Sequence, residues 1–435
     1  MNRKFWTIVG ASALALSMMG CGGSETEQNN GVADSGELTA KETALTAADL
    51  PDISAEDMKK FGDALNAFGS EFEHAYGKAG NYVFSPFSYH SALSMTAYGA
   101  KGETYDEMAQ VLHLVGDKPA AAALNGGMRL KLRYDGQNEK SLFEIANRIW
   151  VDSNSEVVPA FSEAMDNYYK APLKAVDFEH EYSKYVGVIN AWVSNNTGGM
   201  IKNLLKDGDL SADTRMVLVN AIHFDGEWAQ KFKFENTYDA KFKVSDGETN
   251  VRMMNLQANS IVYYRSDEHK YQTASMDYKG GDFAMLIVLP DEVDGLKDVA
   301  AALDAAELRK IIDGQAAHNG NIQLPKFKIE TEITSEDNIA TFEALGMKLA
   351  FSGAADFSEM FTNRAVYIGK IIHKAVIEVD EEGTKAAAAT VVAAKDTAAM
   401  PLDDFIHFRA DHPFEFVLYH KASGAVLFAG QYWGK

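Results

Sequence analysis

Residues 379–402, which read VDEEGTKAAAATVVAAKDTAAMPL, constrain this chain more than any other stretch of it. Between residues 384 and 394 the segment has no Gly and no Pro. It carries one charge, and its other side chains are all small or β-branched. An ordinary surface loop would be rich in Gly, Pro, Asn and Asp. The segment is therefore built like a strand that has no sheet of its own.

In an extended chain, the side chains of this segment would alternate between two faces. The face without any charge or large side chain consists of Thr384, Ala386, Ala388, Thr390, Val392 and Ala394. The face with the single charge consists of Lys385, Ala387, Ala389, Val391 and Ala393. Protein could therefore cover either face except at the lysine. A helix is an alternative because Ala is the best helix former, although about a dozen residues are marginal as an isolated helix. From the pattern alone, helix, loop and latent strand all stay open.

Three blocks near the C-terminus carry a resemblance to a known family. Residues 373–392 (HKAVIEVDEEGTKAAAATVV) resemble the hinge signature of the serpins. Residues 410–420 (ADHPFEFVLYH) and 425–430 (AVLFAG) resemble the closing strands of that family. An alanine run would be weak support by itself, but this order of blocks is specific.

The resemblance extends over roughly residues 55–432. Residues 81–114 resemble an early serpin block that includes the Ser85-Pro86-x-Ser88 step, and Trp228 matches a tryptophan at the top of the family's main sheet. The resemblance implies an α+β fold with a mixed or antiparallel main sheet, additional β-sheets, surrounding helices and an exposed reactive loop.

The hydrophobic pattern agrees with a mixed α and β protein. Apolar residues recur at helical spacing over residues 53–77. Residues 141–152 read as a buried strand. Residues 214–232 begin with a near-continuous apolar run, which is typical of a strand covered on both faces, and residues 283–290 are another such strand. Residues 366–382 are long enough for a central strand that continues into the alanine segment. Such a mixture of strands and helices indicates the α+β class.

The N-terminal region predicts export. A basic start precedes an apolar stretch over residues 5–19, which is too short and too close to the terminus for a favoured membrane span and reads as a secretory signal. Gly20 and Cys21 follow and resemble a bacterial lipoprotein cleavage box, in which the cysteine becomes the lipidated first residue. An ordinary signal with a chance cysteine is the alternative. Because Cys21 is the sole cysteine, the folded body can have neither an internal disulfide nor thiol catalysis.

The chain therefore divides into three predicted parts. Residues 1–20 are a lipoprotein signal peptide, residues 21–50 are a polar and acidic tether, and residues 51–435 are a single serpin-like domain. We expect a monomer in the bacterial cell envelope, held by lipid at the outer membrane on a side that the sequence does not select. The net charge of −21 argues against nucleic acid as a partner.

Motifs for catalysis are missing from the sequence. There is no Gly-x-Ser-x-Gly elbow and no Ser-x-x-Lys, and His180-Glu181 lacks the second histidine of a zinc protease motif. We therefore expect no enzyme, no cofactor and no metal. The resemblance implies that His373 is a buried histidine bonded to Ser85, Ser88 and Asn190 under the main sheet. It also implies that Glu381 pairs with Lys326 at the top of the sheet.

The resemblance implies inhibition of serine proteases, with cysteine proteases as a further class. A serpin offers its loop as a substrate, and after the cut the loop enters the main sheet before the acyl-enzyme is hydrolysed. Gly383 would supply the turn, and Thr384 would enter first. Ala386, Ala387, Ala388, Ala389 and Thr390 would follow without a charge to bury, which would cost on the order of several kcal/mol.

The position of the cut follows from the usual distance to the hinge acid. Counting Glu381 as the first residue, the seventeenth is Thr397, so the reactive bond is expected between Thr397 and Ala398. The spacer that follows is longer than usual, so cleavage after Lys395 or Met400 stays open. The alternatives to an inhibitor are a non-inhibitory serpin that carries a ligand at the cell envelope, and an envelope scaffold or unrecognised hydrolase.

Overall fold

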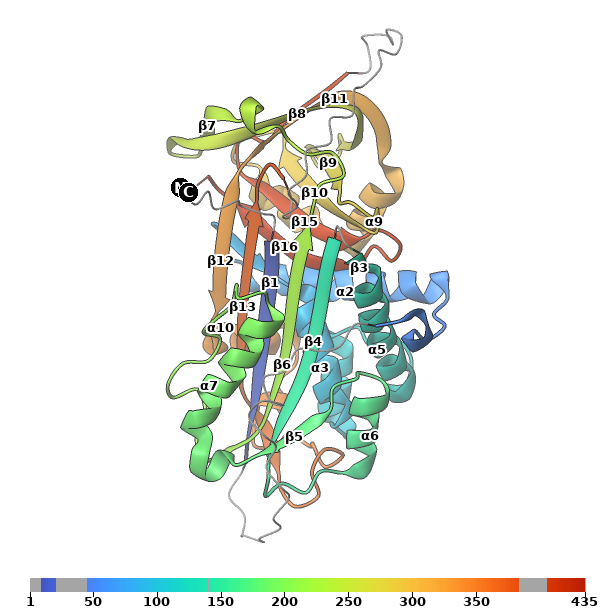
Figure 1. Cartoon of the computed structure of the whole chain (residues 1–435), viewed down its shortest axis with the longest axis vertical. Helices are drawn as coiled ribbons and strands as arrows, with labels where there is room; N and C mark the ends of the chain where they lie inside the picture. The colour runs from blue at the N-terminus through green and yellow to red at the C-terminus, as the bar shows by residue number, and fades with distance from the viewer. Residues whose placement is uncertain (1–8, 21–44, 139–140, 383–404, 435) are drawn as a thin grey trace.

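The computed structural model describes residues 9–20, 45–138, 141–382 and 405–434 (Figure 1). The described residues form two sheets and a set of helices around them. The α-helices are α2 (Ala55–Tyr76), α3 (Pro86–Tyr98), α4 (Gly102–Val111), α5 (Lys118–Asp135), α6 (Pro159–Asn167), α7 (Phe178–Asn196), α8 (Leu296–Ala302), α9 (Ala305–Gly314) and α10 (Ser335–Leu345). Short 3-10 turns lie at η1 (Ala47–Asp49), η2 (Phe234–Asn236) and η3 (Leu349–Phe351).

The main sheet has seven strands among the described residues, in the order β12-β13-β1-β6-β4-β3, with β5 paired to β4. The strands are β1 (Val9–Gly20), β3 (Gln137–Asn138), β4 (Ser141–Asp152), β5 (Leu173–Val176), β6 (Thr214–Gly226), β12 (Phe327–Ile333) and β13 (Val366–Val379). All pairs are antiparallel except β4 with β5. This is the mixed main sheet that was predicted.

The second sheet has nine strands in the described part of the chain, in the order β14-β11-β8-β9-β10-β15-β16-β2, with β7 paired to β8. They are β2 (Tyr82–Phe84), β7 (Tyr238–Val244), β8 (Gly247–Ser266), β9 (Tyr271–Asp277), β10 (Phe283–Pro290), β11 (Ala316–Pro325), β14 (Ile406–Arg409), β15 (Phe414–His420) and β16 (Val426–Tyr432). The predicted α+β class with an additional sheet is confirmed.

Several elements have the bounds that the hydrophobic pattern predicts. The helix expected over residues 53–77 is α2, which begins after Ser54, whose hydroxyl accepts from the Asp57 amide, and ends at Gly77 with φ 59°. The runs 141–152 and 283–290 are β4 and β10. β10 is apolar throughout because both of its faces are covered, whereas β4 also carries Glu144, Asn147 and Arg148 among its apolar residues.

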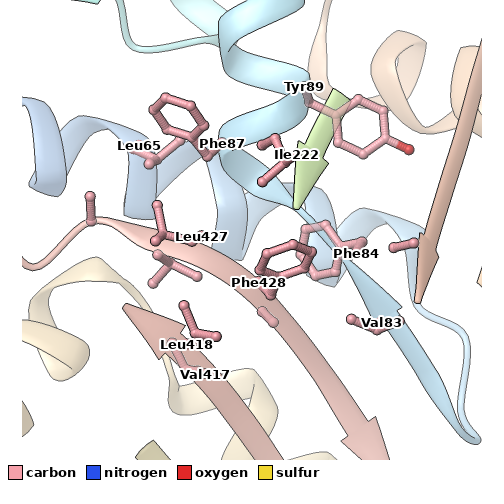
Figure 2. Packing of buried hydrophobic residues seen from close by; sticks show 14 of the residues in the cluster. Leu65, Val83, Phe84, Phe87, Tyr89, Ile222, Val417, Leu418, Leu427 and Phe428 are labelled. Carbon is pink, nitrogen blue, oxygen red and sulfur yellow. The ribbon is translucent and has the colours of Figure 1, made fainter. Parts of the chain in front are cut away.

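The hydrophobic core lies where α2 and α3 cover the strands behind the main sheet. Figure 2 shows Leu65 of α2 and Phe87 of α3 over Leu427 and Phe428 of β16, with Ile222 of β6 beside them. All of these residues are almost completely buried. This core fixes α3 against the back of the main sheet.

The apolar stretch near the N-terminus is a strand in this structure. It forms β1, which lies in the middle of the main sheet between β13 and β6 (Figure 1). The folded body therefore includes a strand that the expected boundary at residue 51 leaves out, and it also includes Leu45, whose amide donates to the Gln137 side chain over 3.0 Å. The predicted removal of residues 1–20 concerns processing of the chain, and it stays a prediction.

Candidate functional site

The candidate site is the central slot of the main sheet, which we define as the space between β13 and β6. β1 fills it. Along the β13 side, Val9 stands opposite Glu378 and Gly20 stands opposite Val366; along the other side, Val9 stands opposite Asp225 of β6. β1 is antiparallel to both neighbours, so β6 and β13 are parallel to each other. The slot accommodates one strand of the length of β1.

The upper end of β13 leads into the segment with the alanines. Past Val379, the Glu381 side chain is almost fully buried, and one of its oxygens lies 2.7 Å from Lys326 Nζ. The Thr237 hydroxyl donates to the other oxygen over 2.8 Å, and the Phe232 amide donates to the Glu381 carbonyl over 3.0 Å. The predicted partners Glu381 and Lys326 thus lie together. These contacts anchor the last residues before the segment.

The two neighbouring acids at this end have opposite electrostatic behaviour. Burial raises the pKa of Asp380 to about 7, against partial compensation from the Glu382 amide. Burial would also raise the pKa of Glu381, but the hydrogen bonds from Lys326 and Thr237 outweigh it and hold that pKa below its ordinary value. At neutral pH Glu381 is therefore ionised, while Asp380 is close to its titration midpoint.

We call the residues that follow β13, 380–382, the hinge; Trp228 lies beside it, just past the end of β6. Its indole Nε1 donates to the Asp380 carbonyl over 3.0 Å, and its ring stacks on Tyr278 at 4.6 Å between centroids. The side chain is buried. Trp228 thus connects the end of β13 to the top of β6 across the slot.

A buried polar cluster lies under the slot, on the side covered by α3. The Ser85 amide donates to His373 Nε2 over 3.1 Å, and the Ser88 hydroxyl donates to Asn220 Oδ1 over 2.6 Å. The Tyr89 ring lies 4.4 Å from the His373 ring. Burial lowers the pKa of His373 to about 3, so the imidazole is neutral at physiological pH. Three of the four residues that were predicted for this cluster are therefore present.

The prediction for Asn190 is wrong. Asn190 lies on α7, on the opposite side of the sheet, where its Oδ1 accepts from the amides of Leu204 and Leu205 and its Nδ2 donates to the Leu205 carbonyl. These bonds satisfy the asparagine locally, so it fixes the chain that follows α7. Asn220 of β6 takes the predicted position.

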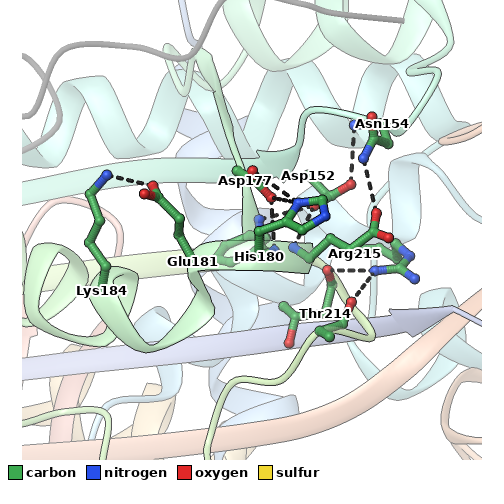
Figure 3. A network of polar contacts seen from close by, with 11 residues as sticks. Asp152, Asn154, Asp177, His180, Glu181, Lys184, Thr214 and Arg215 are labelled. Carbon is green, nitrogen blue, oxygen red and sulfur yellow. Dashed lines mark hydrogen bonds and ion pairs between the residues drawn. The ribbon is translucent and has the colours of Figure 1, made fainter. Parts of the chain in front are cut away.

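Helix α7 covers the slot on its other face and is fixed at its beginning by polar contacts. Figure 3 shows Asp177 bonded to His180, whose amide donates to Asp177 Oδ1 over 2.9 Å, and Glu181 paired with Lys184. Asp152, at the end of β4, accepts from the Phe178 amide over 3.0 Å. His180 and Glu181 thus serve the helix start. This is the structural role of the pair that resembled half of a zinc motif.

The remaining predicted site residues lie outside the described residues. They are Cys21, Gly383, Thr384, Ala386, Ala387, Ala388, Ala389, Thr390, Lys395, Thr397, Ala398 and Met400. Within the described ranges, no group of three or more His, Cys, Asp or Glu is arranged to hold a metal ion. In the same part of the chain, no helix is long and apolar enough to cross a membrane.

Comparisons with known proteins place these features in one class. The family described as Serpin (serine protease inhibitor) matches residues 63–434. The chain is 34% identical over 374 residues to the leukocyte elastase inhibitor of Bos taurus, covering 85% of this chain and 96% of the relative. It is 36% identical over 402 residues to Serpin-Z4 of Hordeum vulgare, covering 89% and 98%. The chain belongs to the serpin family.

A solved structure agrees with this assignment. The native state of Tengpin, a thermophilic serpin, matches with a TM-score of 0.76 at 27% identity, covering 91% of this chain and 98% of that protein. The main sheet, the hinge contacts and the polar cluster therefore belong to a serpin fold.

Proposed function

We propose that this serpin inhibits serine proteases as a suicide substrate, trapping the acyl-enzyme by inserting its cut reactive loop, residues 383–404, into the main sheet. One observation carries the proposal. The sheet holds an additional antiparallel strand, β1, directly beside β13, the strand that continues into the reactive loop. A chain that folds back after Glu381 would run beside β13 in the same direction as β1.

The chemistry needs no catalytic residue from the serpin. The nucleophile of the protease attacks the reactive bond and forms an acyl-enzyme. The cut loop then adds a strand, and about thirteen residues at about 3.3 Å each carry the attached protease several tens of Å. Deacylation competes with this movement. The contribution of the serpin is therefore the speed of insertion, which the uncharged side chains of Thr384, Ala386 and Ala388 favour.

The partner that we propose is a serine protease with a small or tolerant specificity pocket. Thr397 at the expected reactive bond fits such a pocket, and several relatives are named leukocyte elastase inhibitors. Cysteine proteases also form acyl-enzymes and are a further class to test. We infer that the protein itself turns over no substrate.

The test uses the form that begins at Cys21, which we call the processed form; the full chain is residues 1–435. The processed form is incubated with a panel of serine and cysteine proteases and analysed under denaturing conditions. We expect a covalent complex at a stoichiometry near one. Cleavage of the serpin by every protease, with full recovery of protease activity, would refute the inhibitory function.

The reactive bond is proposed between Thr397 and Ala398. Mass spectrometry of the short C-terminal fragment released from a denatured complex identifies it. We expect a fragment that starts at Ala398. A fragment that starts at Asp396, after Lys395, or at Pro401, after Met400, would mean that the longer spacer shifts the register.

We also propose that the processed form is a bacterial envelope lipoprotein, anchored at the outer membrane through lipid on Cys21. A basic start, an apolar stretch and the sole cysteine support this proposal. Metabolic lipid labelling of the wild type and of Cys21→Ser tests it. We expect label only in the wild type, and equal labelling of both would refute the anchor.

A further inference from the structure

In this structure the slot holds β1, and the proposed inhibitory mechanism gives this segment no role. We propose that the slot is a binding site for the chain's own N-terminal segment, Val9–Gly20, and that this segment keeps the full chain inactive until it is removed. The second claim, that the segment keeps the chain inactive, rests on the proposed function, because inhibition requires the reactive loop to enter the slot. The ligand class is an extended peptide of about twelve residues with alternating small and larger apolar side chains.

The backbone pairing of β1 is the first support. β1 pairs with β13 over residues 9–20 and with β6 over residues 9–19, so its amides and carbonyls find partners on two sides. Without it, β6 and β13 would have to approach by about one strand spacing, 4.8 Å, and pair as parallel strands. The sheet therefore has two alternative arrangements, and β1 selects the wider one.

The side chains of β1 fit the two faces of the slot differently. Ala13 and Ala15 pack on the side of α7, in the cluster that contains Trp192. Leu14 and Leu16 point to the opposite face and are fully buried in the main core. Along β1, the small side chains thus lie on the side of the sheet that α7 covers closely, and the large side chains lie on the side of the main core. We call the side of the main core the deep face.

The contact at the lower end of β1 is shaped on both strands. Ser17 stands opposite Lys370 and Met18 stands opposite Ile368, so Gly369 is the extra residue of a bulge in β13. A Cβ atom at Gly369 would lie 2.8 Å from Met19 Cγ. The missing side chain at Gly369 therefore makes room for Met19, which packs on the bulge.

β1 also separates the polar residues of the cluster under the slot. In the register, Leu14 stands between His373 of β13 and Asn220 of β6. Both polar side chains contact the α3 region, His373 through Ser85 and Asn220 through Ser88. β1 thus fills the gap between the two halves of the cluster with an apolar side chain.

The end of β1 coincides with the predicted processing site. β1 ends at Gly20, and cleavage before Cys21 would release the whole strand and leave none of it behind. While it is attached, β1 competes for the slot intramolecularly, at a high effective concentration. Processing would therefore convert a chain with a filled slot into one whose slot is open to the reactive loop.

The test uses the full chain, with retention of residues 1–20 checked by intact mass. Hydrogen exchange is followed by mass spectrometry in the wild type, in Leu14→Asp/Leu16→Asp, and in the matched control Leu14→Met/Leu16→Met, which conserves volume and polarity. We expect β1 amides to exchange at least about a hundredfold more slowly than unprotected amides in the wild type and the control. In the aspartate variant, the protection of β1 should be lost.

The same three proteins are then mixed with pancreatic elastase as the probe protease. We expect covalent complex to form at least tenfold faster with the aspartate variant than with the other two. Unprotected β1 amides in the wild type would overturn the claim that the slot binds β1. This measurement is made on the wild type alone, so it does not depend on whether a variant folds. Equal complex formation by all three, with β1 protected in the wild type, would overturn the inactivation.

One further outcome separates this inference from the proposed function. If β1 is protected in the wild type and displaced in the aspartate variant, but neither the variant nor the processed form traps any protease of the panel, the binding site is upheld. The inhibitory function, and with it the inactivation, would then be wrong.

Discussion

Two segments of this serpin are suited to the same slot, and they differ in what their side chains do there. β1 places Leu14, Leu16 and Met18 on the face toward the core. The corresponding face of the reactive loop carries Thr384 and Ala386, followed by further small residues. At about 0.8 kcal/mol per buried CH₂, a Leu in place of an Ala adds about 2 kcal/mol of burial. The N-terminal segment should therefore bind more stably, residue for residue.

The small side chains of the loop have a different advantage. A strand that enters a closed sheet has to pass between two neighbours, and small uncharged side chains lower the barrier to that passage. A segment that is already in the slot when the sheet forms faces no such barrier. The comparison indicates that the composition of the loop favours fast insertion, whereas the composition of β1 favours stable occupancy.

The largest expected effect is on the loop side of the comparison. Thr384→Arg in the processed form would require a permanently charged guanidinium to enter the sheet first. A barrier increase of about 1.4 kcal/mol already slows insertion tenfold. We expect the variant to be cut as an ordinary substrate, with the stoichiometry of inhibition rising at least tenfold. Lys385→Glu, on the other face, is the matched control and should inhibit nearly normally.

The second prediction concerns β1. Leu16→Ala in the full chain removes a fully buried side chain, and such substitutions cost about 2–5 kcal/mol. We expect the free energy of unfolding to fall by about that amount and the protection of β1 amides to fall with it. Met19→Ala is the control, because Met19 is only half-buried and should cost less. Equal effects of the two substitutions would contradict the deep face that we assign to Leu16.

The third prediction concerns the hinge at the upper end of the slot. We expect its contacts to be the same whether β1 or the reactive loop fills the slot. Lys326→Met removes the partner of a nearly buried carboxylate, and we expect a loss of about 1–3 kcal/mol in the free energy of unfolding. Lys328→Met, two residues further along in β12, removes the exposed partner of Glu378 and should cost less than about 1 kcal/mol. Denaturant unfolding of both variants, in the full chain and the processed form, measures the difference. A larger loss for Lys328→Met would mean that the hinge pair stabilises little.

The smallest expected effect is a pH dependence at Asp380. Its folded pKa of about 7 lies above its ordinary value of 3.8, so the folded state holds the proton more tightly than the unfolded chain. This contribution to stability is full below pH 3.8 and is lost as the pH rises through about 7. We expect Asp380→Asn to reduce the difference in unfolding midpoint between pH 5 and pH 8. Asp239→Asn, at an exposed position, should leave that difference unchanged.

Much of the fold could be predicted from the sequence because burial leaves a pattern. β10 is apolar without a break, β4 is largely apolar, and α2 has its apolar residues at helical spacing. The family resemblance predicts the pair Glu381–Lys326. The residues lie 55 positions apart, and local pattern alone could not join them.

Two features of the structure did not follow from the sequence: the strand β1, and Asn220 in the position predicted for Asn190. An apolar run behind a basic start fits an export signal, and its hydrophobicity alone does not separate that role from a buried strand. The signal that could have revealed β1 is the alternation of Ala13, Leu14, Ala15 and Leu16. Asn220 could have been found as a polar residue inside the apolar run MVLVNAIHF, where a buried amide needs a partner.

The most direct test of the shared slot is a comparison of melting temperatures in four samples: the full chain and the processed form, each intact and each cut within residues 383–404. In the processed form, the cut loop can enter the slot and add a central strand, so we predict a rise of about 10 °C or more. In the full chain, β1 already fills the slot, and we predict a change of less than about 2 °C. Equal rises in the two forms would contradict the account, because the slot would then be open to the loop while the N-terminal segment is still attached.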